Sequence, residues 1–348
     1  MDTIRQKLAL FIENNQMTKN DQLLNRENGQ ISAFFYTFYN RRINCAAIRD
    51  NHNMIANHPD VRFFDTGSQV ATLLSLYDNS AELLERINVV YSLLVEKAGF
   101  WHDSHYIGFT SYLIVTGTAP ENYQNVVART SDFYKGMVEK NFGASEASYP
   151  YAALFGLSNI DVMYGLGQIE QLFQWYKTAL KARNALFIPS VREIAMILIF
   201  NDLVDRNRVI ELKNTIKPAR VLGIKIAMWD AIFYDIVGIL AQLPASASTL
   251  SQELDEVQKF LKTQKGFSQM FLSVHGRYLT STSIIANAYL DEVKRNGSVA
   301  DIASFERMII TRQFTGMFGS FAAELAAHFD RRPGSFAQER HDERWSRQ

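Results

Sequence analysis

Three segments of similar pattern dominate the middle of this chain of 348 residues: SAELLERINVVYSLLVEKA at 80–98, PENYQNVVARTSDFYKGMV at 120–138 and NIDVMYGLGQIEQLFQWYKTAL at 159–180. They begin at Ser80, Pro120 and Asn159, which are 40 and 39 residues apart. Within each segment apolar residues recur every three or four positions, as in a helix that buries one face. A repeat of about 40 residues is typical of stacked helical hairpins.

A shorter and more apolar segment follows each long one. It opens with a serine in each case, at Ser104, Ser148 and Ser190, and serine is favoured immediately before a helix. Each pair of long and short helices buries its apolar faces only when neighbouring pairs stack. The sequence therefore predicts an all-α fold of about six or seven tandem helical hairpins, as an α-solenoid-like array or a compact α/α domain.

The repeated spacing becomes less regular after residue 202. Residues 244–249, Pro-Ala-Ser-Ala-Ser-Thr, have the composition of a linker. We therefore expect a helical-repeat domain at 1–243 and a C-terminal helical segment at 250–330 that packs on it. The charged residues 331–348 have almost no apolar content, so we expect a disordered tail there.

The composition excludes several classes of protein. Lys plus Arg equals Asp plus Glu at 36 each, so no overall positive charge attracts nucleic acid. The most apolar long segment, 224–243, carries two aspartates and does not predict a membrane span. Residues 1–15 mix charged with apolar side chains, unlike a signal peptide. The single cysteine, Cys45, excludes an internal disulfide. These features favour a cytoplasmic protein.

Four aspartates are the best candidates for catalysis. Asp202 and Asp205 lie in Asn-Asp-Leu-Val-Asp, which resembles the motif of the all-helical isoprenoid synthases, where paired carboxylates hold magnesium. The second acidic motif of those enzymes is missing, and charged residues at a helix end explain this one equally well. Asp230 and Asp235 lie in the apolar segment 224–243, as partnered buried acids or pocket residues.

Two other motifs suggest chemistry and have simpler explanations. His102 and His105 are three residues apart and would hold a metal ion only with a third ligand from elsewhere in the chain. The sequence 65–67, Asp-Thr-Gly, matches the loop of aspartic proteases, but it occurs once and precedes a helical pattern, which favours a helix cap. The sequence therefore predicts neither a metal site nor a cofactor.

Two blocks carry a resemblance to a known family. They are Glu-Lys-Ala-Gly-Phe at 96–100 and Ser-Tyr-Pro-Tyr-Ala-Ala-Leu at 148–154. In a helical chain of this length, these blocks resemble a bacterial family known only as domain of unknown function 4003, over residues 30–290. The resemblance implies a bacterial cytoplasmic protein. It transfers no catalytic residue, because none is established for the family.

The leading functional hypothesis is an interaction protein that is not an enzyme. It would hold a protein, a peptide or a small ligand on a concave helical face. Tyr106, Tyr149 and Tyr151, near the starts of short helices, would then lie on one rim of the stack and bind the partner. The alternative is a metal-dependent enzyme with a helical pocket lined by the four aspartates.

Overall fold

The computed structural model describes residues 2–24, 26–58, 67–102, 104–140, 142, 144–180, 188–201, 204–216, 236–264, 271–297, 299 and 301–318. All regular secondary structure in these ranges is helical. The prediction of an all-α protein is therefore confirmed. The predicted cap at Asp65 and Thr66 and the predicted tail at 331–348 lie outside these ranges.

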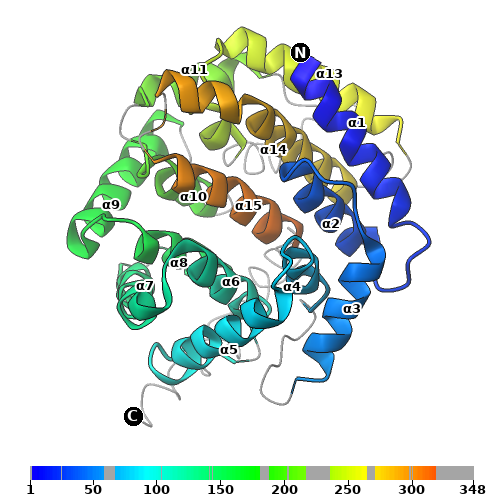
Figure 1. The fold of residues 1–348 in the computed structure, drawn as a ribbon. Helices are drawn as coiled ribbons and strands as arrows, with labels where there is room; N and C mark the ends of the chain where they lie inside the picture. The colour runs from blue at the N-terminus through cyan, green and yellow to red at the C-terminus, as the bar shows by residue number, and fades with distance from the viewer. Residues whose placement is uncertain are drawn as a thin grey trace.

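Figure 1 labels the described helices in chain order. In chain order they are α1 (Asp2–Met17), α2 (Arg26–Phe38), α3 (Cys45–Ala56), α4 (Gly67–Leu74), α5 (Ser80–Glu96), α6 (Ile107–Gly117), the 3₁₀ turn η1 (Pro120–Asn122), α7 (Tyr123–Glu139), the 3₁₀ turn η2 (Glu146–Ser148), α8 (Tyr149–Leu157), α9 (Val162–Ala179), α10 (Ile188–Leu198), α11 (Arg206–Thr215), α13 (Ala247–Lys262), α14 (Phe271–Asn296) and α15 (Ile302–Phe318). Residues 236–240 are also helical.

Consecutive helices pair, and the two members of a pair differ in burial. Contacts join α1 to α2, α3 to α4, α5 to α6, α7 to α8, α9 to α10 and α13 to α14. In α5, α7 and α9 the buried residues form one face, whereas α4 and α8 are buried along almost their whole length. Long helices therefore cover short apolar ones, as the alternation of the two segment types predicts.

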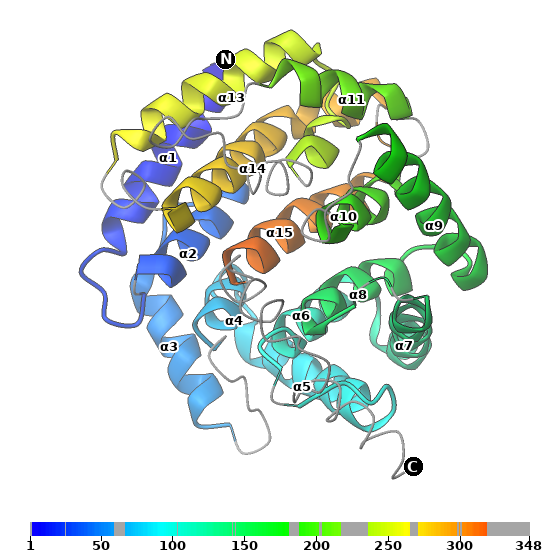
Figure 2. The same ribbon diagram turned by 180° about the vertical axis from the view of Figure 1, so that it is seen from behind.

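The pairs surround a central helix. Figures 1 and 2 show α15 in the middle, with α2, α4, α6, α8, α10 and α14 around it and the other helices outside. Helix α15 contacts α2, α8 and α14, and α1 contacts α14, so the first and last pairs meet. Phe314 of α15 stacks on Phe109 of α6 with ring centroids 4.0 Å apart, which fixes α15 among the inner helices.

The three predicted serines have different positions at the short helices. Ser148 directly precedes α8, and Ser104 lies in the turn before α6. Ser190 lies inside α10, which begins at Ile188, so its predicted place before the helix is wrong. Pro189 explains the earlier start, because proline fits the first turn of a helix. None of the described helices is long and apolar enough to cross a membrane.

Candidate functional site

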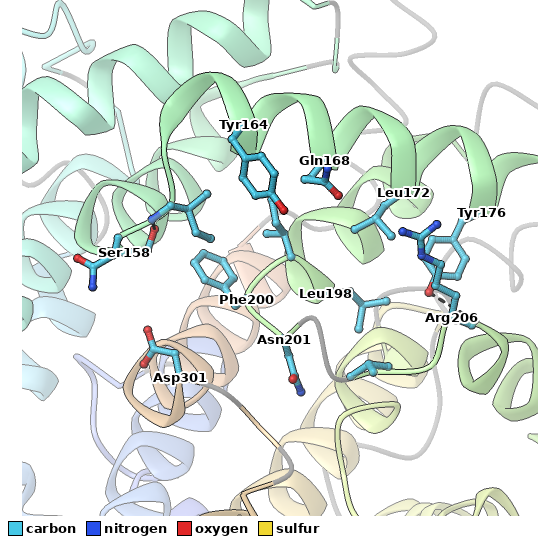
Figure 3. Close-up of a pocket in the computed structure, with 14 residues that line it drawn as sticks. Ser158, Tyr164, Gln168, Leu172, Tyr176, Leu198, Phe200, Asn201, Arg206 and Asp301 are labelled. Atoms are coloured by element: carbon cyan, nitrogen blue, oxygen red, sulfur yellow. Dashed lines mark hydrogen bonds between the residues drawn. The ribbon is translucent and has the colours of Figure 1, made fainter.

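A pocket of about 470 Å³ lies between four helices (Figure 3). Helix α9 forms one wall, and the end of α10 forms the opposite one. Residues 158–160 before α9, Val204 before α11, Arg206 at the start of α11, and Asp301 before α15 complete the lining. The pocket is lined by Ser158, Asn159, Ile160, Tyr164, Gln168, Leu172, Tyr176, Leu198, Ile199, Phe200, Asn201, Val204, Arg206 and Asp301.

The wall from α9 is a row of side chains on one face of the helix. Tyr164, Gln168, Leu172 and Tyr176 are each four residues apart, which places them one above another. Tyr164 is 63% exposed, whereas Leu172 is 9% and Tyr176 0% exposed. The row therefore runs from an open mouth, where Tyr164 lies, to a buried end at Tyr176.

The buried end is closed by a hydrogen bond between helices. The Tyr176 hydroxyl donates to the backbone carbonyl of Arg206 at 3.5 Å. Burial raises the pKa of Tyr176 above its ordinary value, so its hydroxyl stays protonated and able to donate at neutral pH. This contact attaches the first turn of α11 to α9 and fixes the depth of the pocket.

The wall from α10 is the turn that ends this helix. The Asn201 N–H donates to the Leu198 carbonyl at 3.0 Å, and the Val204 N–H donates to the Asn201 carbonyl at 3.3 Å. The Phe200 ring stacks on Phe155 of α8 with centroids 4.7 Å apart. These contacts support the end of α10, whose residues 198–201 line the pocket together with Val204.

Two charged side chains of opposite sign line the pocket. Figure 3 shows Asp301 and Arg206 at opposite ends of it. Asp301 caps α15, because its carboxylate accepts the Ser304 N–H at 3.0 Å and the Ser304 hydroxyl at 2.6 Å. Arg206 is exposed at the start of α11. The pocket thus combines apolar walls with one acid, one base and the amides of Gln168 and Asn201.

A second hollow, of about 550 Å³, lies beside α3 and is lined by residues 20–23 together with Arg49, His52 and Asn53. Arg49 and Asp21 form an ion pair across it at 2.9 Å. Asp21 also accepts the Leu23 N–H at 3.0 Å. Its charged groups are paired with each other or with the backbone, so the pocket beside α9 is the stronger candidate.

The predicted catalytic aspartates are only partly within the described ranges. Asp202, Asp230 and Asp235 lie outside them. Asp205 borders the pocket and caps α11, since its carboxylate accepts the Asn207 N–H at 2.9 Å. Within the described ranges, no three His, Cys, Asp or Glu side chains are grouped so as to hold a metal ion.

The predicted histidine pair is exposed. His102 and His105 lie in the turn before α6, and the residue between them that carries a carboxylate, Asp103, lies outside the described ranges. The His102 backbone carbonyl accepts the Tyr91 hydroxyl at 3.0 Å. This hydrogen bond anchors the turn to α5.

The three tyrosines predicted for an open rim lie inside the protein. Tyr106, Tyr149 and Tyr151 are 9%, 4% and 2% exposed. The Tyr149 ring stacks on Phe100 at 3.9 Å, and the Tyr151 hydroxyl lies 3.5 Å from the Thr315 hydroxyl of α15. The short helices are the inner ones and are covered by the long helices, so side chains near their starts pack between helices.

Sequence reasoning did not single out the residues of the pocket. Gln168 and Tyr164 flank the apolar stripe of α9, where polar and exposed side chains are ordinary, so their sequence positions do not indicate a pocket. Arg206 has no recognisable motif around it. The sequence does carry one sign of the difference. When the three long segments are aligned, Gln168 occupies the position that arginine holds in the other two.

The comparisons with known proteins give a family and no relative of known activity. No curated protein and no solved structure matches the chain. The model of a family described as "Protein of unknown function (DUF4003)" matches residues 16–313, which include every residue of the pocket. The match confirms the resemblance found in the sequence and extends beyond its predicted limits at both ends. The chain therefore belongs to the DUF4003 family.

Proposed function

We propose that this protein is a cytoplasmic binding protein, not an enzyme, and that the pocket beside α9 is its ligand site. The pocket itself is the observation that supports this function. Ligand sites typically have volumes of about 300–1,000 Å³, apolar walls and a few polar groups that orient the ligand. The pocket, of about 470 Å³, has this character. A small molecule or one side chain of a partner peptide would fit its size.

The polar groups restrict the orientation of a ligand. Leu172 and Leu198 provide apolar contact, while Asp301 and Arg206 offer opposite charges at the two ends. A ligand with one charged or polar group at each end would complement this arrangement. The exposed ring of Tyr164 at the mouth is placed to cover the part of the ligand nearest to solvent.

We also infer that the pairs α5–α6, α7–α8 and α9–α10 are versions of one unit. The fourth, fifth, eighth, eleventh and fifteenth residues of α5, α7 and α9 are buried in all three helices. Helices that bury the same positions pack on their partners in the same register. On this inference, the pocket lies where the pair α9–α10 differs from α5–α6 and α7–α8.

A ligand screen with a blocked pocket tests the proposed function. The melting temperature of the protein would be measured with amino acids, amines, organic acids, sugars, nucleotides and short peptides. A ligand that binds only the folded state stabilises it by about 2.7 kcal/mol at a hundredfold excess over its dissociation constant. We expect at least one class to raise the melting temperature.

The blocking variant is Gln168→Trp, which places an indole in the pocket, and the control is Met163→Gln. Met163 is 74% exposed on the same helix and does not line the pocket. The expected shift is present in the wild type and in the control, and absent in Gln168→Trp. A response that persists in Gln168→Trp, or no response to any class, would overturn the proposal.

A further inference from the structure

The C-terminal ends of the inner helices carry backbone carbonyls that lack partners within the helix. Arg129 of α7 satisfies those of α8. Its Nε donates to the Gly156 carbonyl at 3.1 Å, and its Nη2 donates to the Ser158 and Ile160 carbonyls at 2.8 and 2.7 Å. One guanidinium thus binds three alternate carbonyls, of which the last lies two residues before α9 begins.

Arg208 of α11 makes the same arrangement two outer helices further along the chain. Its Nε donates to the Ala241 carbonyl at 2.9 Å, and its Nη2 donates to the Leu243 carbonyl at 2.8 Å. Nη2 also donates to the Ala245 carbonyl, two residues before α13 begins. The donors, the alternation of the acceptors and their distance from the next outer helix all match those of Arg129.

Arg86 of α5 has a related role. Its Nη2 donates to the Val115 carbonyl near the end of α6 at 3.1 Å, and its Nε donates to the Tyr123 hydroxyl at 2.8 Å. An arginine of the outer helix therefore binds the end of the inner helix in the units before and after α9–α10.

The unit α9–α10 has a glutamine at this place. Arg86 and Arg129 are the seventh residues of α5 and α7, and the seventh residue of α9 is Gln168. A glutamine side chain is shorter than an arginine side chain, carries no charge and has one nitrogen donor group instead of three. It cannot reproduce the three hydrogen bonds of Arg129.

Two of the residues that correspond to the three acceptors line the pocket. In the two matching arrangements the acceptors lie six, four and two residues before the next outer helix. Counting back from Arg206, the first residue of α11, gives Phe200, residue 202 and Val204. Phe200 and Val204 line the pocket together with Gln168. Within the described ranges, no side chain donates a hydrogen bond to the carbonyl of either one.

We propose that the pocket binds a guanidinium group, which takes the place that Arg129 and Arg208 fill in the neighbouring units. This inference rests on the proposed function and names its ligand. The planar guanidinium would donate to the Phe200 and Val204 carbonyls, at the negative end of the α10 dipole. The group can belong to a small molecule such as arginine or to an arginine side chain of a peptide.

The two charged residues refine the choice of ligand. The Asp301 carboxylate adds negative charge to the pocket and favours a cation. Arg206 lies at the other end and disfavours a second positive charge there, but it would pair with a carboxylate. A guanidine that also carries a carboxylate, as free arginine does, therefore fits better than agmatine, which carries an amine instead.

The test measures the binding of four probes by calorimetry and by melting temperature: L-arginine, agmatine, the peptide Gly-Arg-Gly and L-citrulline. Citrulline has nearly the shape of arginine but a neutral ureido group. We expect at least one guanidine to bind and citrulline to bind about tenfold more weakly or not at all. Binding of free arginine without the peptide assigns the site to a small molecule, and the reverse result assigns it to a peptide.

The deciding variant is Gln168→Arg, which supplies a guanidinium from the chain itself. It should melt at a higher temperature than the wild type and lose the binding of guanidines. Met163→Arg adds the same side chain at an exposed position outside the pocket and should keep that binding. Gain of stability in Gln168→Arg shows that this variant folds, so its loss of binding is interpretable.

The outcomes separate this inference from the proposed function. If another class of ligand binds in a manner that Gln168→Trp blocks, and no guanidine binds, the inference is wrong while the proposed function stands. If guanidines bind Gln168→Arg as tightly as the wild type, their site lies elsewhere and the inference is overturned. If no compound binds, both are overturned.

Discussion

The units α7–α8 and α9–α10 share five buried positions of their outer helices but have different residues at the seventh position, Arg129 and Gln168. In the first, Arg129 donates three hydrogen bonds to the end of α8 and to the connection that follows. In the second, Gln168 lines a pocket of about 470 Å³ together with Phe200 and Val204, two of the three corresponding residues. A structural arginine in α7–α8 and the proposed ligand site in α9–α10 thus occupy corresponding places.

This difference indicates how a binding site can arise in a helical array. The end of α10 keeps other supports, because its turn is closed by the Val204 N–H and Phe200 stacks on α8. Replacing an arginine by glutamine then removes a side chain without removing the scaffold around it. The space that remains is the pocket, and it is lined by Phe200 and Val204, whose carbonyls we propose as acceptors for a guanidinium.

The sharpest test of the comparison is to truncate both residues. Arg129→Ala should lower the free energy of unfolding by about 3 kcal/mol, because hydrogen bonds to a charged group contribute about 1.5–3 kcal/mol each and this side chain is half-buried. Gln168→Ala should change it by less than about 0.5 kcal/mol. Denaturant unfolding of the two variants measures both values. Equal losses at the two positions would contradict the distinction between them.

The sequence predicts much of this fold because its signals are local. Residues Leu83, Leu84 and Ile87 of α5 and their counterparts in the next two long helices mark the buried faces, and the structure buries them. The hydrogen bonds of Arg129 are different. They depend on how α7 lies against the end of α8, which no local pattern encodes, although the exchange of arginine for glutamine is visible in the sequence.

The candidate site is harder to predict from the sequence for a related reason. Tyr106, Tyr149 and Tyr151 are aromatic residues near helix starts, as expected for a rim, but the arrangement of inner and outer helices buries them. The pocket depends on how three consecutive helices, α9, α10 and α11, pack with the distant start of α15, and the feature that we propose to bind the ligand is a pair of backbone carbonyls. Carbonyls are present at every residue, so sequence gives no sign of where they are left without a donor.

The second prediction concerns the close packing of α7 against α8. A Cβ at Gly156 would lie 2.3 Å from the Thr130 hydroxyl, 2.9 Å from the Val126 carbonyl oxygen and 3.0 Å from the Thr130 nitrogen. Two of these atoms belong to the backbone, so the helices must separate. Gly156→Ala should therefore destabilise the protein by about 1–3 kcal/mol. Denaturant unfolding measures the loss, and an unchanged stability would show that the unit tolerates a wider spacing.

The third prediction concerns a variant in which α9–α10 receives the arginine that α7–α8 has at the same position. Gln168→Arg should raise the free energy of unfolding by about 1–2 kcal/mol, since a charged donor would reach carbonyls at the end of α10. Gln168→Lys serves as the control, because its ammonium carries the charge without the planar fork and should gain less. If the lysine variant is as stable as the arginine variant, charge alone explains the gain and the geometric match with Arg129 is not required.

The smallest expected effect comes from Gly167, next to Gln168. A Cβ built at Gly167 would meet no atom within 4 Å, in contrast to Gly156. Alanine lowers the conformational entropy of the unfolded chain and favours a helix, so Gly167→Ala should stabilise the protein by about 0.5–1 kcal/mol. Ligand binding should remain as in the wild type, because residue 167 does not line the pocket. A loss of binding in this variant would mean that the pocket needs the backbone freedom of glycine beside Gln168, and that a simple exchange of side chains does not account for the site.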